Sequence, residues 1–143
     1  MPGYRVIPWE KDGDVFRDPR TFPGASVVCW STHDTAPIDA WWPDLPERDR
    51  VQLAARASTS AGPEDDPGRS IALLRDMYLA RSDLALVLVQ ELLGMKDRIN
   101  TPATVGPQNW SWRFPRTLEE LERDPELAAR FEAIRLAVDT SGR

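Results

Sequence analysis

The stretch Ala25–Trp42, ASVVCWSTHDTAPIDAWW, decides the fold of this chain. It opens with an unbroken apolar run, Val27–Trp30, which is too short for a buried helix and too continuous for a strand with one face in water. The run therefore predicts a buried parallel strand. Polar residues follow where such a strand must end, and Pro37 suits the first turn of a helix capped by Asp34 or Thr35.

A histidine and an aspartate stand side by side where this strand ends. In parallel α/β folds the carboxyl ends of the strands gather ligands and catalytic groups. His33 and Asp34 therefore form the strongest functional signal in the sequence. A purely structural alternative stays open, in which Asp34 caps the following helix and His33 makes only local hydrogen bonds.

Length and composition restrict what the chain can be. Its 143 residues, 41% of them hydrophobic, predict at most one domain with a core of its own. The net charge of −5, with 18 basic residues scattered along the chain, argues against a nucleic-acid-binding surface. The single cysteine, Cys29, predicts a small core residue rather than a disulfide or a metal ligand. No apolar run is long enough to cross a bilayer and no signal peptide is recognisable, so we expect a cytoplasmic protein without a membrane partner.

Two further apolar runs predict strands that accompany the first. Tyr4–Pro8 has the composition of a β-strand. Leu84–Val89 predicts a second fully buried strand, and polar Gln90 and Glu91 follow it in the way that His33-Asp34 follows the first.

Helical periodicity recurs between the strands. One helix is predicted from Pro46, with Val51, Ala54 and Ala55 on its apolar face. A second is predicted over Pro67–Ala80 by apolar residues at three- and four-residue steps.

The end of the chain predicts two more helices. Thr117 and Glu120 have the spacing of a capping box, and Asp124-Pro125 begins the last helix. We expect the apolar stripe of that helix to pack against the core; it consists of Leu127, Phe131, Ile134 and Val138.

Two segments predict irregular structure. Glu10–Gly24 is charged, interrupted by Gly and Pro and without a period, which indicates a surface loop with room for a helical turn. Met95–Pro115 is rich in Pro, Gly and Asn yet holds aromatic residues, and long loops of that kind are usually functional rather than disordered.

Three short strands separated by helical segments give the order βαβαβα, which is typical of the α/β class. Three parallel strands cannot close a barrel, since about eight are needed, and as an open sheet they leave apolar edges. The pattern therefore predicts that residues 1–143 are one part of a larger α/β domain, with no separate second domain.

The segments GYRVIPWE, SVVCWSTHDTAPIDAWW and LVLVQELLGMKDRINTPATVGPQNWSWRFP, in that order, closely resemble the last third of amylomaltases, which are 4-α-glucanotransferases. The resemblance runs from about Pro2 to Pro115 and continues loosely through the terminal helices. It implies a (β/α)8 TIM barrel in which Tyr4–Pro8, Val27–Trp30 and Leu84–Val89 are the sixth, seventh and eighth strands. The chain would then be the carboxyl-terminal part of a catalytic barrel, about three βα units and the terminal helices.

The resemblance also implies roles for individual residues. Asp34 resembles the family's third carboxylate, which stabilises the distorted sugar of the transition state, and His33 resembles the neighbour that hydrogen-bonds the same sugar. Arg98, Asn100 and Trp110 resemble the loop after the last strand, near the active-site mouth, and are assigned to substrate binding. A structural alternative stays open for this loop, because Arg and Asn often hold irregular backbone in place. The family's Asp nucleophile and Glu acid/base belong to the fourth and fifth strands, upstream of the matching segments.

Two positions depart from the family's motifs. Ser31 stands where a glycine is common before the THD triplet, and Ala103 replaces the glycine of N-x-P-G-T, which calls the backbone of that turn into question. Trp41 and Trp42 diverge by about a hundred degrees on a helix, so we expect one to pack inward and the other to meet a neighbouring helix.

The function implied is transfer of α-1,4-glucan segments between maltooligosaccharides, with no metal and no organic cofactor. We expect the chain alone to be inactive, because retention requires two carboxyl groups roughly 5 Å apart. The alternative is a non-catalytic glucan-binding or barrel-completing module that acts with a separately encoded amino-terminal piece. A hydrolase built from Ser31, His33 and Asp34 is disfavoured, because G-x-S-x-G is lacking and adjacent residues at a strand end rarely face one another.

Overall fold

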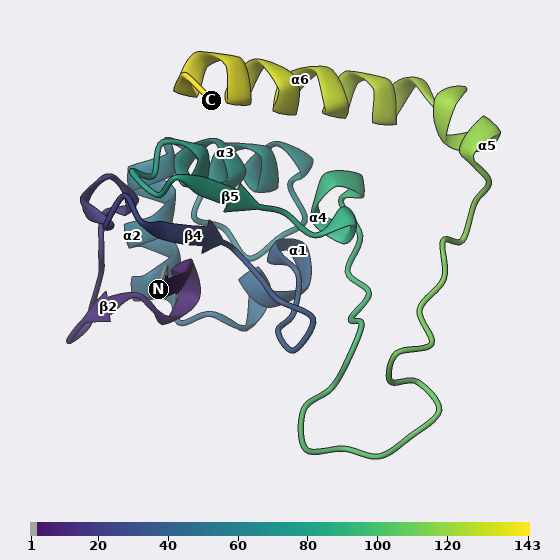
Figure 1. Ribbon diagram of the computed structural model, residues 1–143, viewed down its shortest axis with the longest axis horizontal. Coiled ribbons are helices and arrows are strands. Elements are labelled where there is room, and N and C mark those ends of the chain that lie inside the picture. Colours follow the sequence, from purple (N-terminus) through teal and green to yellow (C-terminus); the bar gives the residue numbers. More distant parts are fainter. Residues whose placement is uncertain (1–2) are drawn as a thin grey trace.

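A computed structural model describes residues 3–143 and shows a parallel sheet covered by helices (Figure 1). The sheet has three strands in the order β1-β4-β5, and both pairs are parallel. Its strands are β1 (Gly3–Val6), β4 (Ser26–Cys29) and β5 (Leu84–Leu86). The predicted central parallel strand is confirmed, with Val28 and Cys29 buried, and the chain belongs to the α/β class.

Several helices surround the sheet. The two longer helices between β4 and β5 are α2 (Glu47–Ala57) and α3 (Pro67–Tyr78), and the long α6 lies along α3 (Figure 1). The predicted helices at both places are confirmed. The other elements are η1 (Ile7–Trp9), β2 (Lys11–Asp12), β3 (Val15–Phe16), η2 (Pro19–Thr21), α1 (Ile38–Trp41), η3 (Trp42–Asp44), α4 (Val89–Leu93), α5 (Leu118–Glu122) and α6 (Pro125–Ser141).

The core lies between one face of the sheet and α3. Val28 of β4 and Leu73, Leu74 and Met77 of α3 have no exposed surface. The Trp30 indole reaches the same layer and donates from Nε1 to the Leu73 carbonyl at 2.9 Å. This hydrogen bond satisfies the polar end of the buried indole, so the ring can pack without an unpaired donor.

The opposite face of the sheet is open at β1 and β5. The register aligns Tyr4, Val27 and Leu84, whose side chains therefore share a face. Tyr4, Leu84 and Leu86 are 66%, 57% and 51% exposed. The prediction of a fully buried strand over Leu84–Val89 is wrong in burial and in length, because β5 is an edge strand that ends at Leu86.

The helix boundaries correct three local predictions. The residue before α1 is Pro37, and neither Asp34 nor Thr35 caps this helix, because Thr35 is engaged in a turn of its own with Thr32. In α2 the buried positions include Leu53 and Ala54; the predicted Val51 and Ala55 are exposed.

Gln90 and Glu91 do not repeat the exposed position of His33 and Asp34, since both are buried within α4. The segment predicted as a surface loop before β4 contains the short antiparallel hairpin of β2 and β3 and the helical turn η2.

The two adjacent tryptophans separate as predicted, with one exception. Trp42 packs in the core and donates from Nε1 to the Gly62 carbonyl at 2.7 Å. Trp41 meets the Trp30 ring, at 5.7 Å between centroids, rather than a neighbouring helix.

The terminal helices follow the predicted signals. Thr117 and Glu120 form a capping box before α5, and Asp124 caps α6. Of the predicted stripe, Ile134 is buried, whereas Phe131 is 40% exposed. Residues 95–115 form the predicted irregular loop, which extends away from the sheet (Figure 1). None of the helices in residues 3–143 is both long enough and apolar enough to span a bilayer.

Candidate active-site residues

A tight turn carries His33 and Asp34 directly after the central strand. The Thr35 hydroxyl accepts from the Thr32 backbone N–H at 2.8 Å, and the Thr32 hydroxyl accepts from the Asp34 N–H at 3.2 Å. The Thr35 N–H closes the turn on the Thr32 carbonyl at 3.1 Å. The two threonine hydroxyls therefore stabilise the turn by accepting backbone hydrogen bonds within it. The turn presents the His33 and Asp34 side chains at the carboxyl end of β4.

Each oxygen of the Asp34 carboxylate has a polar neighbour. Asn100 donates from Nδ2 to Asp34 Oδ1 at 2.6 Å, and His33 Nε2 lies 3.2 Å from Asp34 Oδ2. The Asp34 side chain remains 43% exposed, so it is oriented by Asn100 and is still reachable by a ligand.

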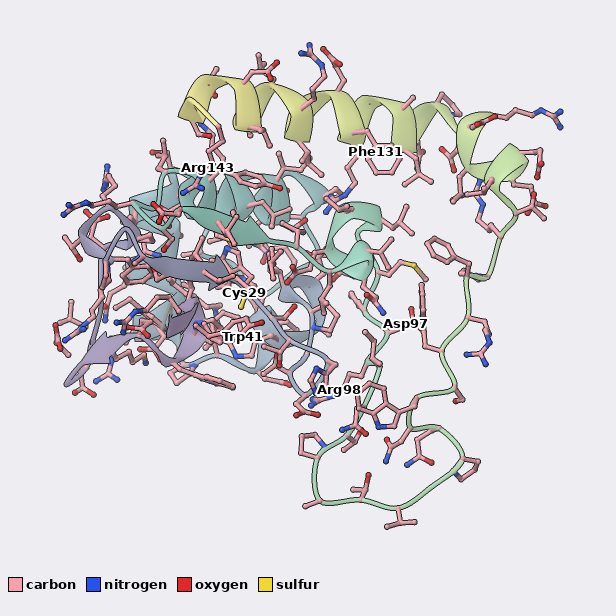
Figure 2. All side chains as sticks on the ribbon, in the orientation of Figure 1. Cys29, Trp41, Asp97, Arg98, Phe131 and Arg143 are labelled. Atoms are coloured by element: carbon pink, nitrogen blue, oxygen red, sulfur yellow. The ribbon has the colours of Figure 1, made fainter. Side chains whose placement is uncertain are left out.

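The 95–115 loop docks on this turn through its own backbone and side chains. The Asn100 N–H donates to the His33 carbonyl at 3.1 Å, and Arg98 Nη2 donates to the Asp34 carbonyl at 2.9 Å. Figure 2 shows Arg98 at the junction of the loop and the turn. Turn and loop therefore form one unit, although 66 residues separate Asn100 from Asp34.

Trp110 completes the cluster from the far end of the loop. Its ring lies 4.9 Å from the His33 ring, between centroids, at an interplanar angle of 39°. Trp110 has a φ of 60°, and its N–H donates to the Ile99 carbonyl at 2.9 Å. The indole is 62% exposed beside His33, so a flat apolar face adjoins the Asp34 carboxylate.

Asn109 has a structural part within the loop. Its Oδ1 accepts from the Thr101 N–H at 3.0 Å, and its Nδ2 donates to the Thr104 carbonyl at 3.0 Å. These bonds fold the loop on itself and bring Trp110 back toward Asn100. Ala103, within the same turn, has the left-handed φ of 59° that a glycine adopts without strain.

The structure brings all five predicted site residues together, namely Asp34, His33, Asn100, Arg98 and Trp110. Sequence reasoning did not anticipate the buried link beneath them, in which Ser31 Oγ donates to Glu91 Oε1 at 2.6 Å. Burial raises the pKa of Glu91 to about 7, and the Ser31 hydrogen bond opposes that rise.

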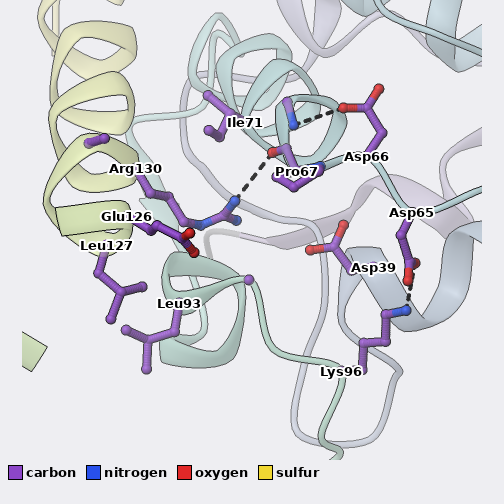
Figure 3. A pocket seen from close by; sticks show the side chains of 13 residues that line it. Asp39, Asp65, Asp66, Pro67, Ile71, Leu93, Lys96, Glu126, Leu127 and Arg130 are labelled. Carbon is purple, nitrogen blue, oxygen red and sulfur yellow. Dashed lines mark hydrogen bonds and ion pairs between the residues drawn. The ribbon is translucent and has the colours of Figure 1, made fainter. Parts of the chain in front are cut away.

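A separate cavity of about 710 Å³ lies among α3, α4 and α6 (Figure 3). Asp39, Lys96 and Arg130 line it, and none of the five predicted site residues does. Within residues 3–143, no group of three or more His, Cys, Asp or Glu side chains is arranged to hold a metal ion.

Comparison with known proteins gives consistent matches. The sequence model of the 4-alpha-glucanotransferase family, glycoside hydrolase family 77, matches residues 1–119. The chloroplastic/amyloplastic 4-alpha-glucanotransferase DPE1 of Oryza sativa subsp. japonica is 31% identical over 139 residues, covering 94% of this chain and 23% of that protein. The 4-alpha-glucanotransferase of Aquifex aeolicus is 29% identical over 119 residues, covering 80% of this chain and 23% of that protein.

Solved structures agree on the fold. The amylomaltase from Streptococcus agalactiae in complex with acarbose superposes with a TM-score of 0.79 at 21% identity, over 100% of this chain and 28% of that one. The amylomaltase from Corynebacterium glutamicum gives a TM-score of 0.72 at 16% identity, over 96% of this chain and 25% of that one. The chain spans between 20% and 27% of the length of the curated relatives. It belongs to the 4-alpha-glucanotransferase family and matches the carboxyl-terminal part of its members.

Proposed function

We propose that this chain supplies the Asp34 side of an active site that transfers α-1,4-glucan segments between maltooligosaccharides. It would do so as the part of a (β/α)8 barrel that holds strands six to eight and the terminal helices, with residues 1–143 in that one domain. The observation that carries the proposal is the carboxylate of Asp34, held by Asn100 and His33 at the carboxyl end of a central parallel strand.

The geometry suits stabilisation of a flattened sugar. Asp34 would accept hydrogen bonds from the hydroxyls of the glucose unit at the cleavage point. Bonds of this kind strengthen as the ring approaches an oxocarbenium-like shape, and they lower the barrier by several kcal/mol. Because Asn100 and His33 already orient the carboxylate, little reorganisation is needed when the charge develops.

The remaining residues of the cluster would bind and place the substrate. The exposed Trp110 indole offers a flat apolar face to the C–H face of a sugar, and His33, which it contacts, can hydrogen-bond the same glucose. Arg98 and Asn100 would act mainly by fixing the loop against the turn, since Arg98 donates to the Asp34 carbonyl and Asn100 to the His33 carbonyl.

The proposal assigns the nucleophile and the acid/base to other strands of the barrel. A retaining transfer needs two carboxyl groups about 5 Å apart, and Asp34 has the third role. The exposed Tyr4, Leu84 and Leu86 support this assignment, because they form an apolar sheet face that further strands would cover. The cytoplasmic location stays a prediction from the sequence.

The same exposed face favours a second candidate. The chain would be a non-catalytic glucan-binding or barrel-completing module, paired with a separately encoded amino-terminal piece. It differs from the first candidate in one respect, namely whether Asp34 takes part in the reaction once the barrel is complete.

Complementation separates the two candidates. The chain is mixed with the amino-terminal piece of a family member, cut before the segment that this chain matches, and glucose release from maltotriose is measured for each piece and for the mixture. We expect activity in the mixture alone. In the mixture, Asp34→Asn should abolish activity without weakening association of the pieces, whereas the control Asp65→Asn, a surface aspartate paired with Lys96, should leave both unchanged.

The outcomes are distinct. Full activity with Asp34→Asn contradicts the assignment of Asp34. A mixture that associates and binds maltoheptaose in calorimetry, yet releases no glucose, favours the binding module.

A further inference from the structure

A buried hydrogen bond ties the two halves of the site together from below. Ser31 directly follows β4, and Glu91 lies in α4 after β5, so the parallel pairing of these strands brings the two residues to the same end of the sheet. Ser31 Oγ donates to Glu91 Oε1 at 2.6 Å, and the residues are only 4% and 2% exposed. A hydrogen bond of this length between two buried side chains is a strong positional restraint.

The Glu91 carboxyl contacts the start of the segment that carries the site. Ser31 is the first residue of that segment, and the hydrogen bond from its hydroxyl favours the ionised form of the carboxyl. His33 and Asp34 follow two and three residues later. A single buried side chain therefore holds the start of the turn.

Charged and titratable groups from several elements surround this carboxyl. They are Cys29 of β4, Asp39 of α1, Tyr78 of α3 and Arg130 of α6. Arg130 also donates from Nη2 to the Glu91 backbone carbonyl at 2.6 Å, which fixes the position of α4. Glu91 is therefore anchored independently of the turn, as a residue that positions another must be.

Burying the polar side chains of Gln90 and Glu91 destabilises the folded state more than burying apolar side chains would. Glu91 Oε2 and both polar atoms of the fully buried Gln90 have no hydrogen-bond partner among residues 3–143. An unsatisfied buried polar group destabilises the folded state. A small apolar residue would avoid that loss, so a buried carboxyl at this position calls for a role beyond filling space.

We infer that Glu91 is a positioning residue for Asp34, acting through Ser31 on the turn that carries His33 and Asp34. The effect on transfer rests on the proposed function; the effect on the turn does not. A residue without a side-chain hydroxyl at position 31 could not make this contact.

Nuclear magnetic resonance of the 143-residue chain tests the effect on the turn, because His33 is its single histidine and gives one imidazole signal. The variants are Ser31→Ala, which removes only the donor, Glu91→Leu, which removes the acceptor, the double variant, and Glu91→Gln, which keeps an acceptor oxygen. We expect the first two to shift the His33 imidazole and Asp34 amide signals, the double variant to shift them no further, and Glu91→Gln to restore most of the original positions.

The control is Glu119→Gln on the exposed side of α5, which should leave those signals unchanged. Unchanged His33 and Asp34 signals in Ser31→Ala overturn the inference. This variant loses a single hydroxyl, so it keeps the test decisive even if Glu91→Leu does not fold.

Kinetics in the complemented mixture test the effect on transfer. Because Asp34 would act in the transition state, Ser31→Ala should lower kcat about tenfold and leave KM nearly unchanged. Equal kcat values with displaced His33 signals overturn the catalytic part. A wild-type mixture without activity contradicts the proposed function instead, and the resonance experiment still decides whether Glu91 positions the turn.

Discussion

Asp34 has polar neighbours that are near and far in sequence. His33 precedes it directly, whereas Asn100 donates to it from the loop after α4. In this turn the Thr32 and Thr35 hydroxyls accept the hydrogen bonds from the backbone N–H groups, so the Asp34 side chain caps no helix. The structural alternative for Asp34, a helix cap, is thereby excluded, and its carboxylate is available for a ligand.

Glu91 should make stability depend on pH in a direction opposite to that of a salt-bridged carboxylate. Burial is the largest cause that raises its pKa, from 4.5 to about 7, and the nearby Asp39 adds to the rise. The folded state thus holds this proton more tightly than the unfolded chain. The resulting stability is complete below the unfolded pKa of 4.5 and is lost as the pH rises through about 7.

Comparison of Glu91→Gln with the unmodified chain isolates this effect. Between about pH 5 and about pH 8, the free energy of unfolding of the unmodified chain should fall by roughly 2 to 3 kcal/mol relative to Glu91→Gln. Urea unfolding at the two pH values measures it. The exposed Glu119→Gln variant should track the unmodified chain, and a constant difference between Glu91→Gln and the unmodified chain would contradict the raised pKa.

Ala103 stores strain that glycine would release. Its φ of 59° is left-handed, where a Cβ costs about 1 kcal/mol or more. We expect Ala103→Gly to stabilise the docked loop by about 1 kcal/mol, seen as roughly fivefold slower proteolysis within residues 95–115. Ala128→Gly, in the exposed interior of α6, should instead destabilise its helix by about 1 kcal/mol.

At the scale of elements, α4 is held where its left-handed end meets α6. Gly94 has a φ of 68°, and a Cβ there would lie 3.3 Å from Arg130 Cζ. Arg130 in turn donates from Nε to the Leu92 carbonyl at 2.8 Å and closes the last turn of α4. The glycine is therefore needed for its backbone and for the space that it leaves.

Gly94→Ala should test both the left-handed backbone of Gly94 and the space that it leaves for Arg130. We expect the free energy of unfolding in urea to fall by about 2 kcal/mol, half from the backbone and half from displaced Arg130. Gly13→Ala is the matched control, since its φ is 60° and no atom lies within 4 Å of an added Cβ. Equal losses in the two variants would show that Arg130 moves aside freely.

The sequence predicted elements better than it predicted which of their faces are covered. The run Val27–Trp30 signalled a buried strand because helices cover one of its faces and neighbouring strands pair with both of its edges. Leu84–Val89 carries the same signal, yet β5 is an edge strand, and periodicity within a segment contains no information about what lies beside it. In α2 the predicted Ala54 is buried, but it is joined by Leu53 and not by Val51 or Ala55, for the same reason.

The candidate site was predictable only in part from local pattern. His33 and Asp34 could be placed at a strand end by their position alone. Asn100, Arg98 and Trp110 came from the family resemblance, because no spacing rule joins residues that lie more than 60 positions apart. The Ser31–Glu91 bond depends on strand pairing and was not predictable from either source.

At the scale of the whole molecule, helices cover one face of the sheet, and the other face is exposed at β1 and β5. Leu84 is exposed in this chain but would be covered in a complete barrel. Leu84→Asp should therefore change the free energy of unfolding of the chain by less than about 0.5 kcal/mol. It should weaken association with the amino-terminal piece at least about tenfold, because a charge would be buried there.

Leu118→Asp provides the matched control for that association. Leu118 is 71% exposed on α5, away from the sheet, so its variant should associate normally in titration calorimetry. Unweakened association of Leu84→Asp would show that the open face of the sheet is not the contact surface.

The outer margins of β1 and β5 have a consequence for the chain in isolation. Each strand pairs with β4 on one side only, so a row of peptide N–H and C=O groups points outward from both. Rows of this kind act as templates for further strands, and chains kept alone at high concentration should polymerise into ribbons that bind thioflavin. The complementary barrel piece would then pair with these strand edges and suppress polymer growth in proportion to the amount added.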